Sequence, residues 1–267
     1  MGVASIELLD ALGQTAREAG DEILKIVERG FDVDVKGDKS PVTEADHAAE
    51  KVILAALKQH CGDVPVIAEE QVAAGNVPAH EDTFFLVDPL DGTKEFIRGG
   101  EDYTVNIGLI ENGLPVMGIV FSPATGRLHL GLNGRGAWLE GPGGTRSVIM
   151  TRELGEDRVA VASKSHLSQE TVDYLGSVFG GREPERVSVG SSLKFCIVAE
   201  GRADIYPRLS PTCEWDTAAG HAVLLAAGGR VDGLDGKSLA YDKPKYFNPG
   251  FVATAGWQAP RIDAFMA

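Results

Sequence analysis

Several features that mark other classes of protein are missing from this sequence. Cysteine occurs only at positions 61, 196 and 213 and never in a Cys-x-x-Cys pair, which argues against a disulfide framework or a zinc site. No apolar run approaches the roughly 20 residues that a membrane-spanning helix needs. The first ten residues carry Glu7 and Asp10 and no basic side chain, unlike a secretory signal. We therefore expect a cytoplasmic protein without an integral membrane segment, and peripheral association with the inner membrane face stays open.

Positive charge is scarce as well. The chain has 25 Lys and Arg against 39 Asp and Glu, a net charge of −14 at pH 7. A protein this acidic repels nucleic-acid polymers and anionic membranes on average. Small phosphorylated molecules remain candidate partners, provided that metal cations lie between the protein and the phosphate.

Two common catalytic motifs are also absent. The sequence contains no Gly-x-Ser-x-Gly elbow and no Gly-x-x-x-x-Gly-Lys-Ser/Thr loop, so neither a hydrolase-type serine nucleophile nor a phosphate-binding P-loop is expected. The pair Ser191-Ser192 is interpreted as the N-cap of a following helix rather than as a nucleophile. These absences favour water as the attacking group.

The composition is that of a folded domain, with 43% hydrophobic and 24% charged residues. An apolar stripe after Ser5 predicts a helix that ends at Gly30. Thr43, with Asp46 three residues later, predicts a capping box at the start of a second helix. Beyond it, Asn112-Gly113 marks a hairpin within an antiparallel meander. The strands expected in this middle third are 64–68, 83–87, 103–110, 114–121 and 127–132.

Strands and helices alternate after the glycine-rich stretch Gly141–Gly144, which we take as the boundary between two halves, 1–142 and 143–267. The N-terminal half is expected to carry an antiparallel-rich sheet. The C-terminal half is expected to have helices at 168–179, 191–199 and 215–227. The predicted class is therefore α/β (α+β), with sheet layers between helices.

An acidic segment follows an apolar strand at Asp88-Pro89-Leu90-Asp91-Gly92-Thr93. The strand delivers Asp88 to its carboxyl end, Pro89 stiffens the turn and Gly92 permits a sharp bend. Two carboxylates, a backbone carbonyl and a hydroxyl then surround one small volume, and such hard oxygen ligands suit Mg²⁺. The alternative is ordinary turn chemistry, for which Asp-Pro and Asp-Gly are common.

Two further acidic motifs support the metal interpretation. Glu69-Glu70 follows a β-rich run, and Asp216 precedes an alanine-rich helix. Taken singly, the first is typical of a solvated face and the second of a helix cap or first-turn acid.

In this order, Glu69-Glu70, Asp88 to Thr93 and Trp215-Asp216-x-x-Ala-Gly resemble the signatures of the inositol monophosphatase superfamily, over nearly the whole chain up to Gly229. These are Mg²⁺-dependent, lithium-sensitive phosphatases. Three further segments, 39–46, 92–96 and 162–166, are similar to the 3′(2′),5′-bisphosphate nucleotidases of the CysQ type. Inositol monophosphatases more typically have Gly-Thr-Thr-Asn-Phe where this chain has Gly-Thr-Lys-Glu-Phe. The resemblance implies a layered αβαβα sandwich of the sugar-phosphatase kind.

The resemblance also implies roles for individual residues, with two or three Mg²⁺ per site. The implied metal ligands are Glu69, Asp88, the Leu90 carbonyl, Asp91 and Asp216. The implied catalytic residues are Asp46 and Thr93, which activate the attacking water, and Glu70. The implied substrate-binding residues are Glu69, Leu90, Asp91, Gly92, Thr93, His166, Ser191, Lys194, Arg208 and Asp216. The chain departs from the family at Lys164, where Arg is common, and at Ala68, where many relatives have Ser or Gly.

The expected activity is removal of the 3′-phosphate of 3′-phosphoadenosine 5′-phosphate by magnesium-activated water, in sulfur assimilation, with 3′-phosphoadenosine 5′-phosphosulfate as a further candidate substrate. One alternative is an inositol monophosphatase or another sugar-phosphate phosphatase. Others are a non-catalytic Mg²⁺- or nucleotide-binding module and a structural dimer whose acids are only turns and caps. The sequence leaves monomer and homodimer open.

Overall fold

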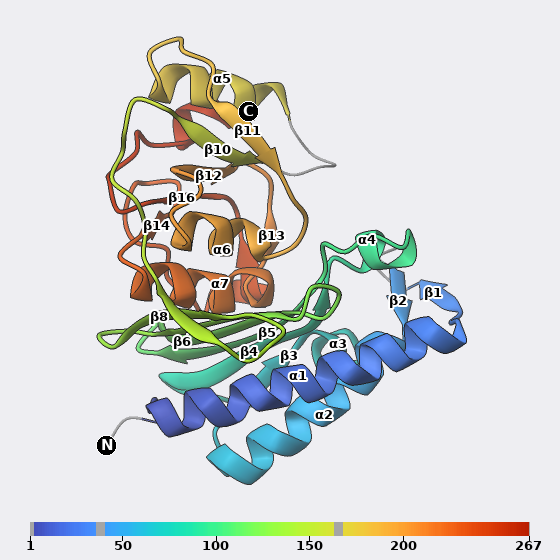
Figure 1. Ribbon diagram of the computed structural model, residues 1–267. Helices are drawn as coiled ribbons and strands as arrows, with labels where there is room; N and C mark the ends of the chain where they lie inside the picture. The colour runs from blue at the N-terminus through green and yellow to red at the C-terminus, as the bar shows by residue number, and fades with distance from the viewer. Residues whose placement is uncertain (1–2, 36–40, 163–167, 267) are drawn as a thin grey trace.

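A computed structural model describes residues 3–35, 41–162 and 168–266. Its helices and sheets alternate in layers (Figure 1). Helices α1 (Ile6–Arg29) and α2 (Glu44–Cys61) cover one face of a seven-stranded sheet. Helices α6 (Leu193–Ala199) and α7 (Trp215–Ala226) lie between that sheet and a five-stranded one, and α5 (Gln169–Val178) covers the outer face. The predicted αβαβα sandwich is confirmed.

The two N-terminal helices begin where their capping residues predict, and the first also ends at its predicted glycine. The Ser5 hydroxyl oxygen accepts a hydrogen bond from the Leu8 amide at 3.1 Å. Gly30 ends α1 with a positive φ of 80°, a conformation that glycine adopts without strain. At the start of α2, Thr43 and Asp46 form the predicted capping box. The apolar stripe of α1 packs on the sheet beneath it.

The seven-stranded sheet has the order β3-β4-β5-β6-β7-β8-β9. Strands β3 and β4 run parallel and the other neighbours antiparallel, so the predicted meander is confirmed. The hairpin turn has positive φ at both Asn112 and Gly113. Strand β4 continues beyond the predicted run, with a break in pairing between Asp88 and Asp91. The bounds are β3 (Val66–Ala68), β4 (Thr83–Asp91), β5 (Thr104–Glu111), β6 (Leu114–Ser122), β7 (Arg127–Leu132), β8 (Gly136–Glu140) and β9 (Arg146–Ile149).

The stretch Gly141–Gly144 turns between β8 and β9, which pair with each other. The first sheet therefore extends to Ile149, past the position chosen from composition. Division of the chain at 142/143 stays a prediction.

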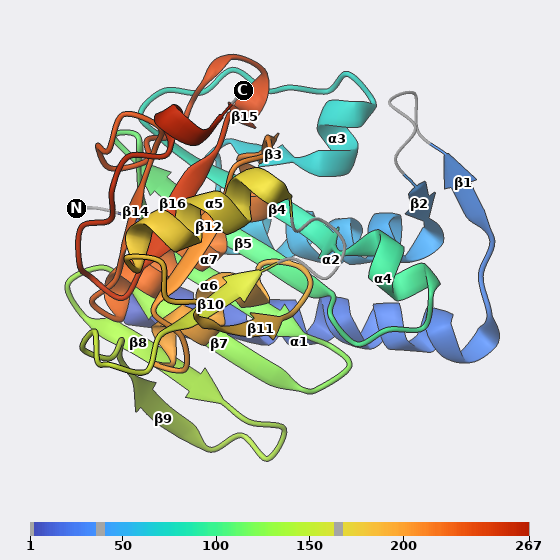
Figure 2. The ribbon, with the colours of Figure 1, turned by 90° about the horizontal axis from the view of Figure 1, so that it is seen from above.

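The second sheet has the order β11-β10-β12-β16-β14. Seen from above in Figure 2, the small β1–β2 pair lies beside α4 at one end of the molecule. None of the described helices combines the length and the apolar character that a bilayer-spanning segment requires. The remaining elements are β1 (Val33–Val35), β2 (Pro41–Thr43), α3 (Glu69–Ala73), α4 (Thr93–Ile97), β10 (Val159–Ala162), β11 (Glu185–Ser188), β12 (Ile205–Arg208), β13 (Thr212–Cys213), β14 (Arg230–Asp232), η1 (Pro244–Tyr246), β15 (Phe247–Asn248), β16 (Phe251–Thr254) and η2 (Asp263–Phe265).

A stripe of glycine crosses the first sheet beneath α7. Gly108, Gly118 and Gly131 are register partners on β5, β6 and β7. A Cβ at Gly108 would lie 2.8 Å from the Ala218 Cβ, and one at Gly118 would overlap the Ala219 carbonyl oxygen. The backbone of α7 therefore rests directly on the sheet, at a height that any side chain in the stripe would change.

A half-buried carboxylate links the middle helix layer to the first sheet. Glu200, at the end of α6, accepts hydrogen bonds from Arg127 at 2.7 Å and pairs with His129 at 2.8 Å. Burial alone raises the pKa of Glu200, but these two partners outweigh burial and lower its pKa to about 2. The pair on β7 therefore holds α6 in place through an ionised glutamate.

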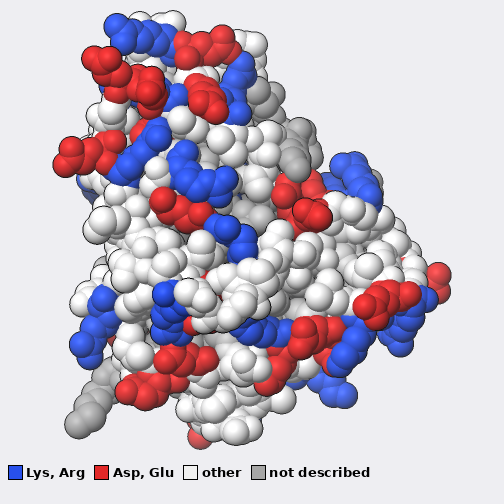
Figure 3. Space-filling view, viewed as in Figure 1, with Lys and Arg blue, Asp and Glu red and all other residues white. Residues whose placement is uncertain are grey.

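All three cysteines have free thiols, as the absence of paired cysteine motifs predicts. Cys196 is buried, whereas Cys61 and Cys213 are half-buried. On the face shown in Figure 3, acidic and basic side chains are interspersed, and neither sign covers a continuous area.

Gly118→Ala is expected to destabilise the fold by about 2–3 kcal/mol, because its methyl group would push α7 off the sheet. Gly141→Ala is the matched control, since no neighbouring side chain or backbone atom lies within 4 Å of the position that its Cβ would take. Urea unfolding followed by circular dichroism measures both variants. Equal unfolding midpoints for the two variants would contradict direct packing of the α7 backbone on the sheet.

Candidate active site

Strand β4 delivers the acidic segment to the edge of the first sheet. Gly92 follows with φ 93° and ψ 30°, a left-handed conformation, and begins α4. A Cβ at this position would lie 2.7 Å from the Asp102 carbonyl oxygen. Both the dihedral angles and the lack of space require glycine at this bend.

Asp88 is the most deeply buried acid of the segment, with 2% of its surface exposed. Its Oδ1 accepts a hydrogen bond from the Leu90 amide at 3.0 Å. Burial raises the pKa of Asp88 well above its usual range, and the charges of Glu69, Asp91 and Asp216 raise it further. The acids of three separate motifs therefore interact electrostatically around Asp88.

Asp91 and Asp216 approach each other from opposite layers. Burial and then the charge of Asp216 raise the pKa of Asp91 to about 7, although the nearby Lys194 charge and the Ser192 amide act against this rise. Burial also raises the pKa of Asp216, a first-turn residue of α7. Backbone amides help to hold both side chains: Asp91 accepts from Ser192 at 2.6 Å and Asp216 from Cys213 at 3.1 Å.

Within the described ranges, no group of three or more His, Cys, Asp and Glu side chains forms a ready-made metal centre. The acids are instead turned toward donors of their own, as Asp216 is toward Thr212 and Cys213. The donor set nevertheless fits a divalent cation. It consists of carboxylates and a carbonyl, which are hard oxygen ligands, and their mutual repulsion is the property that a bound cation removes.

Asp46 and Thr93, predicted as the water-activating pair, lie side by side. Asp46 Oδ2 accepts from the Thr43 amide at 2.7 Å and the Thr43 hydroxyl at 2.8 Å. Its other oxygen, Oδ1, accepts from Thr93 Oγ1 at 3.4 Å, and the same hydroxyl lies 3.1 Å from the Leu90 carbonyl oxygen. The helix cap and the candidate proton acceptor are thus two oxygens of one carboxylate.

Glu69 and Glu70 form the first turn of α3. The Glu70 amide donates to Glu50 Oε2 at 3.0 Å. Glu50 is buried on α2 and was not predicted from sequence. Its spacing of four residues from Asp46 places the two acids on one helix face, which was the available signal.

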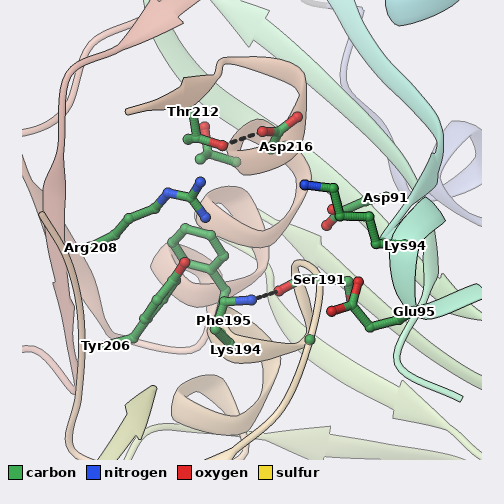
Figure 4. Close-up of a pocket in the computed structure, with 13 residues that line it drawn as sticks. Asp91, Lys94, Glu95, Ser191, Lys194, Phe195, Tyr206, Arg208, Thr212 and Asp216 are labelled. Atoms are coloured by element: carbon green, nitrogen blue, oxygen red, sulfur yellow. Dashed lines mark hydrogen bonds between the residues drawn. The ribbon is translucent and has the colours of Figure 1, made fainter. Parts of the chain in front are cut away.

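A cavity of about 160 Å³ opens beside these acids. Figure 4 shows Asp91 and Asp216 on its walls together with Arg208 and Ser191. Lys94, Glu95 and Tyr206 were not predicted from sequence, although the first two belong to the Gly-Thr-Lys-Glu-Phe motif. The lining residues are Asp91, Gly92, Lys94, Glu95, Gly190, Ser191, Lys194, Phe195, Tyr206, Arg208, Thr212, Asp216 and Thr217.

Two cations on one wall of the cavity are oriented by backbone carbonyl groups. Lys194 Nζ donates to the Ser191 carbonyl oxygen at 2.5 Å and lies 5.5 Å above the Tyr206 ring. Arg208 donates to the carbonyl oxygens of Ser210 and Pro211 at 3.2 and 3.0 Å. Neutral carbonyls hold these side chains without cancelling their charge, which suits recognition of an anion. His166 lies outside the described residues.

The turn before α6 differs from its prediction in one detail. Ser192 occupies the predicted N-cap position, but its side chain does not cap the helix. Its hydroxyl group bonds instead to Asn106 Oδ1 at 2.6 Å and Thr104 Oγ1 at 2.9 Å. Ser191 before it has a positive φ of 50°, a conformation uncommon outside glycine. The side chain is diverted because it anchors this turn to β5.

The family model named Inositol monophosphatase family matches residues 6–263. The chain belongs to the inositol monophosphatase family. Within the family, 3′(2′),5′-bisphosphate nucleotidase CysQ from Salmonella typhimurium is 44% identical over 250 residues, which cover 92% of this chain and 99% of that protein. The enzyme of the same name from Escherichia coli K12 is also 44% identical, over 91% of this chain and 98% of its own. The crystal structure of CysQ from Bacteroides thetaiotaomicron matches with a TM-score of 0.77 and 38% identity, over 93% and 97% of the two chains.

Asp91→Asn is expected to stabilise the metal-free protein at pH 8 and to leave its stability unchanged at pH 4. A carboxyl whose pKa rises from 3.8 to about 7 on folding binds more protons in the folded state, so wild-type stability falls as pH rises through that interval. The asparagine variant has no carboxyl group at this position, so its stability should not fall in this way as the pH rises. Thermal unfolding in a chelator between pH 4 and 8 measures the difference, with the exposed Asp82→Asn as control. A D91N protein less stable than wild type at pH 8 would contradict the assignment.

Proposed function

We propose that the protein is a metal-dependent phosphatase that removes the 3′-phosphate of 3′(2′),5′-bisphosphate nucleotides, with 3′-phosphoadenosine 5′-phosphate as the preferred substrate. The observation that carries the proposal is the electrostatic convergence of Glu69, Asp91 and Asp216 on the buried Asp88. The full-length similarity to CysQ nucleotidases supports the substrate class.

Glu69, Asp88, the Leu90 carbonyl, Asp91 and Asp216 would hold Mg²⁺. Bound Mg²⁺ supplies charge neutralisation of the phosphate and lowers the pKa of water. The protein's own contribution is to keep these oxygens together on rigid elements, the end of β4 and the first turn of α7. The occupancy, two or three ions, stays a prediction.

Thr93 orients the attacking water in this mechanism, and Asp46 accepts a proton through the Thr93 hydroxyl. Two donors from Thr43 engage Asp46 Oδ2, and hydrogen bonds to a carboxylate favour its ionised, proton-accepting form. The opposite oxygen faces Thr93 Oγ1. Glu70 stays a predicted catalytic residue to which we assign no separate step.

The phosphate that is not cleaved would be bound by Lys194 and Arg208, with Ser191 and His166 as further nucleotide contacts. Gly92 and Thr93 would contact the phosphate that is cleaved. The two cations line the same cavity as Asp91 and Asp216, so a molecule with two phosphates can engage metal ligands and cations at once. Cytoplasmic location, a place in sulfur assimilation, use of the phosphosulfate and the oligomeric state stay predictions.

A panel of phosphorylated compounds tests the substrate class. We expect phosphate release from 3′-phosphoadenosine 5′-phosphate to exceed release from inositol 1-phosphate and to require added Mg²⁺. Asp88→Asn, the catalytic control, should reduce phosphate release more than about 100-fold. Even mutation of a residue that only orients a metal ligand typically lowers metal affinity or activity about 10–100-fold, and Asp88 is itself a proposed ligand. The reverse substrate ranking would favour an inositol monophosphatase. No release from any compound would favour a binding module.

Thr93→Val is expected to lower kcat by about 100-fold or more, the usual contribution of a positioned acid or base. Mg²⁺ binding should be retained. Thr93→Ser is the matched control, because it keeps the hydroxyl group that faces Asp46 and should keep most of the activity. Steady-state kinetics at saturating Mg²⁺ compare the three proteins, and equal kcat values for the valine and serine variants would exclude Thr93 from proton handling.

A further inference from the structure

Glu50 is a buried acid that the proposed mechanism does not use. It lies on α2 with 3% of its surface exposed. Its Oε2 accepts a hydrogen bond from the Glu70 amide at 3.0 Å, and its Oε1 accepts one from Gln71 Nε2 at 3.3 Å. Burying a carboxylate is unfavourable unless its oxygens are hydrogen-bonded, and both oxygens of Glu50 are.

The hydrogen bond from the Glu70 amide to Glu50 caps α3, a helix whose own N-cap residue supplies no side-chain acceptor. The N-cap residue of α3 is Ala68, whose backbone has the extended conformation of a capping residue, with φ −110° and ψ 142°, but which makes no side-chain cap. The first amides of a helix need acceptors from elsewhere. Glu50 supplies one from α2, a separate element, at the turn that carries Glu69.

One face of α2 therefore contacts both segments that carry site residues, the β4–α4 bend and helix α3. Asp46 and Glu50 are one helical turn apart. Asp46 meets Thr93 of the β4–α4 bend, and Glu50 meets Glu70 of α3. The spacing of these two acids on a rigid helix sets how the Glu69-Glu70 turn lies relative to the bend that follows Asp88.

We propose that Glu50 is a positioning residue for the metal site: by capping α3 from outside, it holds the Glu69 carboxylate in the position where Glu69 and Asp88 share a divalent cation. Glu69 and Asp88 already interact through their charges. The inference rests on the proposed metal site but not on the identity of the nucleotide. It assigns Glu50 no contact with substrate.

Calorimetric titration with Mg²⁺ in the absence of substrate tests the proposal. Glu50→Ala should raise the Kd for Mg²⁺ about 10–100-fold, the range found for residues that orient metal ligands. Glu50→Gln should give a smaller increase, because its amide oxygen still accepts the Glu70 N–H. At saturating Mg²⁺, kcat of both variants should stay within about threefold of wild type, since the loss lies in metal binding.

Glu200→Gln is the control, because Glu200 is also a hydrogen-bonded glutamate with little exposed surface, half-buried rather than buried, and lies at the far end of α6 from Lys194. It should lower the melting temperature and leave the Kd for Mg²⁺ unchanged. An unchanged Kd in folded Glu50→Ala, or the same shift in Glu200→Gln, would overturn the proposal.

A second substitution distinguishes loss of the helix cap from a general disturbance of the fold. Adding Ala68→Ser to Glu50→Ala places a hydroxyl acceptor at the N-cap of α3, and at least threefold of the lost Mg²⁺ affinity should return. No recovery in a folded double variant would refute the capping explanation. Wild-type protein that binds Mg²⁺ but hydrolyses no bisphosphate would refute the proposed activity alone, whereas wild-type protein that binds no divalent cation would refute both.

Discussion

The rest of this structure has to hold together a group of buried carboxylates that repel one another. Asp88 lies in the interior with three other acids acting on it, an arrangement that opposes ionisation of the group. The scaffold keeps the acids together with backbone amides, from Leu90 to Asp88 and from Ser192 to Asp91. The first amide lies at the end of β4 and the second at the start of α6, so backbone groups rather than flexible side chains hold the mutually repelling acids.

The acids of the site come from different layers of the sandwich, which explains why the site needs the whole chain. Asp88 and Asp91 come from the first sheet, Asp216 from the middle helices, and Asp46 from the outer helix layer. The Ser191-Ser192 turn fastens the middle layer to β5 through Asn106 and Thr104. A loss of docking between layers would separate ligands that are each correctly folded in their own element.

Much of the fold and part of the site were predictable from sequence, because helix caps and hairpin turns are determined by residues that are close together in the chain. The capping box of Thr43 and Asp46, the Asn112-Gly113 hairpin and the layered fold followed from spacing, turn chemistry and family resemblance. Contacts between distant segments were predicted only where the family resemblance named both residues, as for Asp46 and Thr93. Neither the diversion of the Ser192 side chain nor the bond from Glu50 to the Glu70 amide leaves a local pattern, since each depends on how layers meet. The pairing across 141–144 is another contact of this kind: its glycines close a hairpin within one sheet, which the composition alone does not show.

The glycine stripe under α7 has a consequence for which substitutions this chain can accommodate. Because Gly108 and Gly118 bring peptide groups into direct contact with the helix, the height of α7 is set by backbone atoms and not by the rotamers of intervening side chains. Asp216 at the start of that helix inherits this fixed height. Substitutions of apolar residues elsewhere in the layers should therefore leave the distance between Asp216 and β4 unchanged.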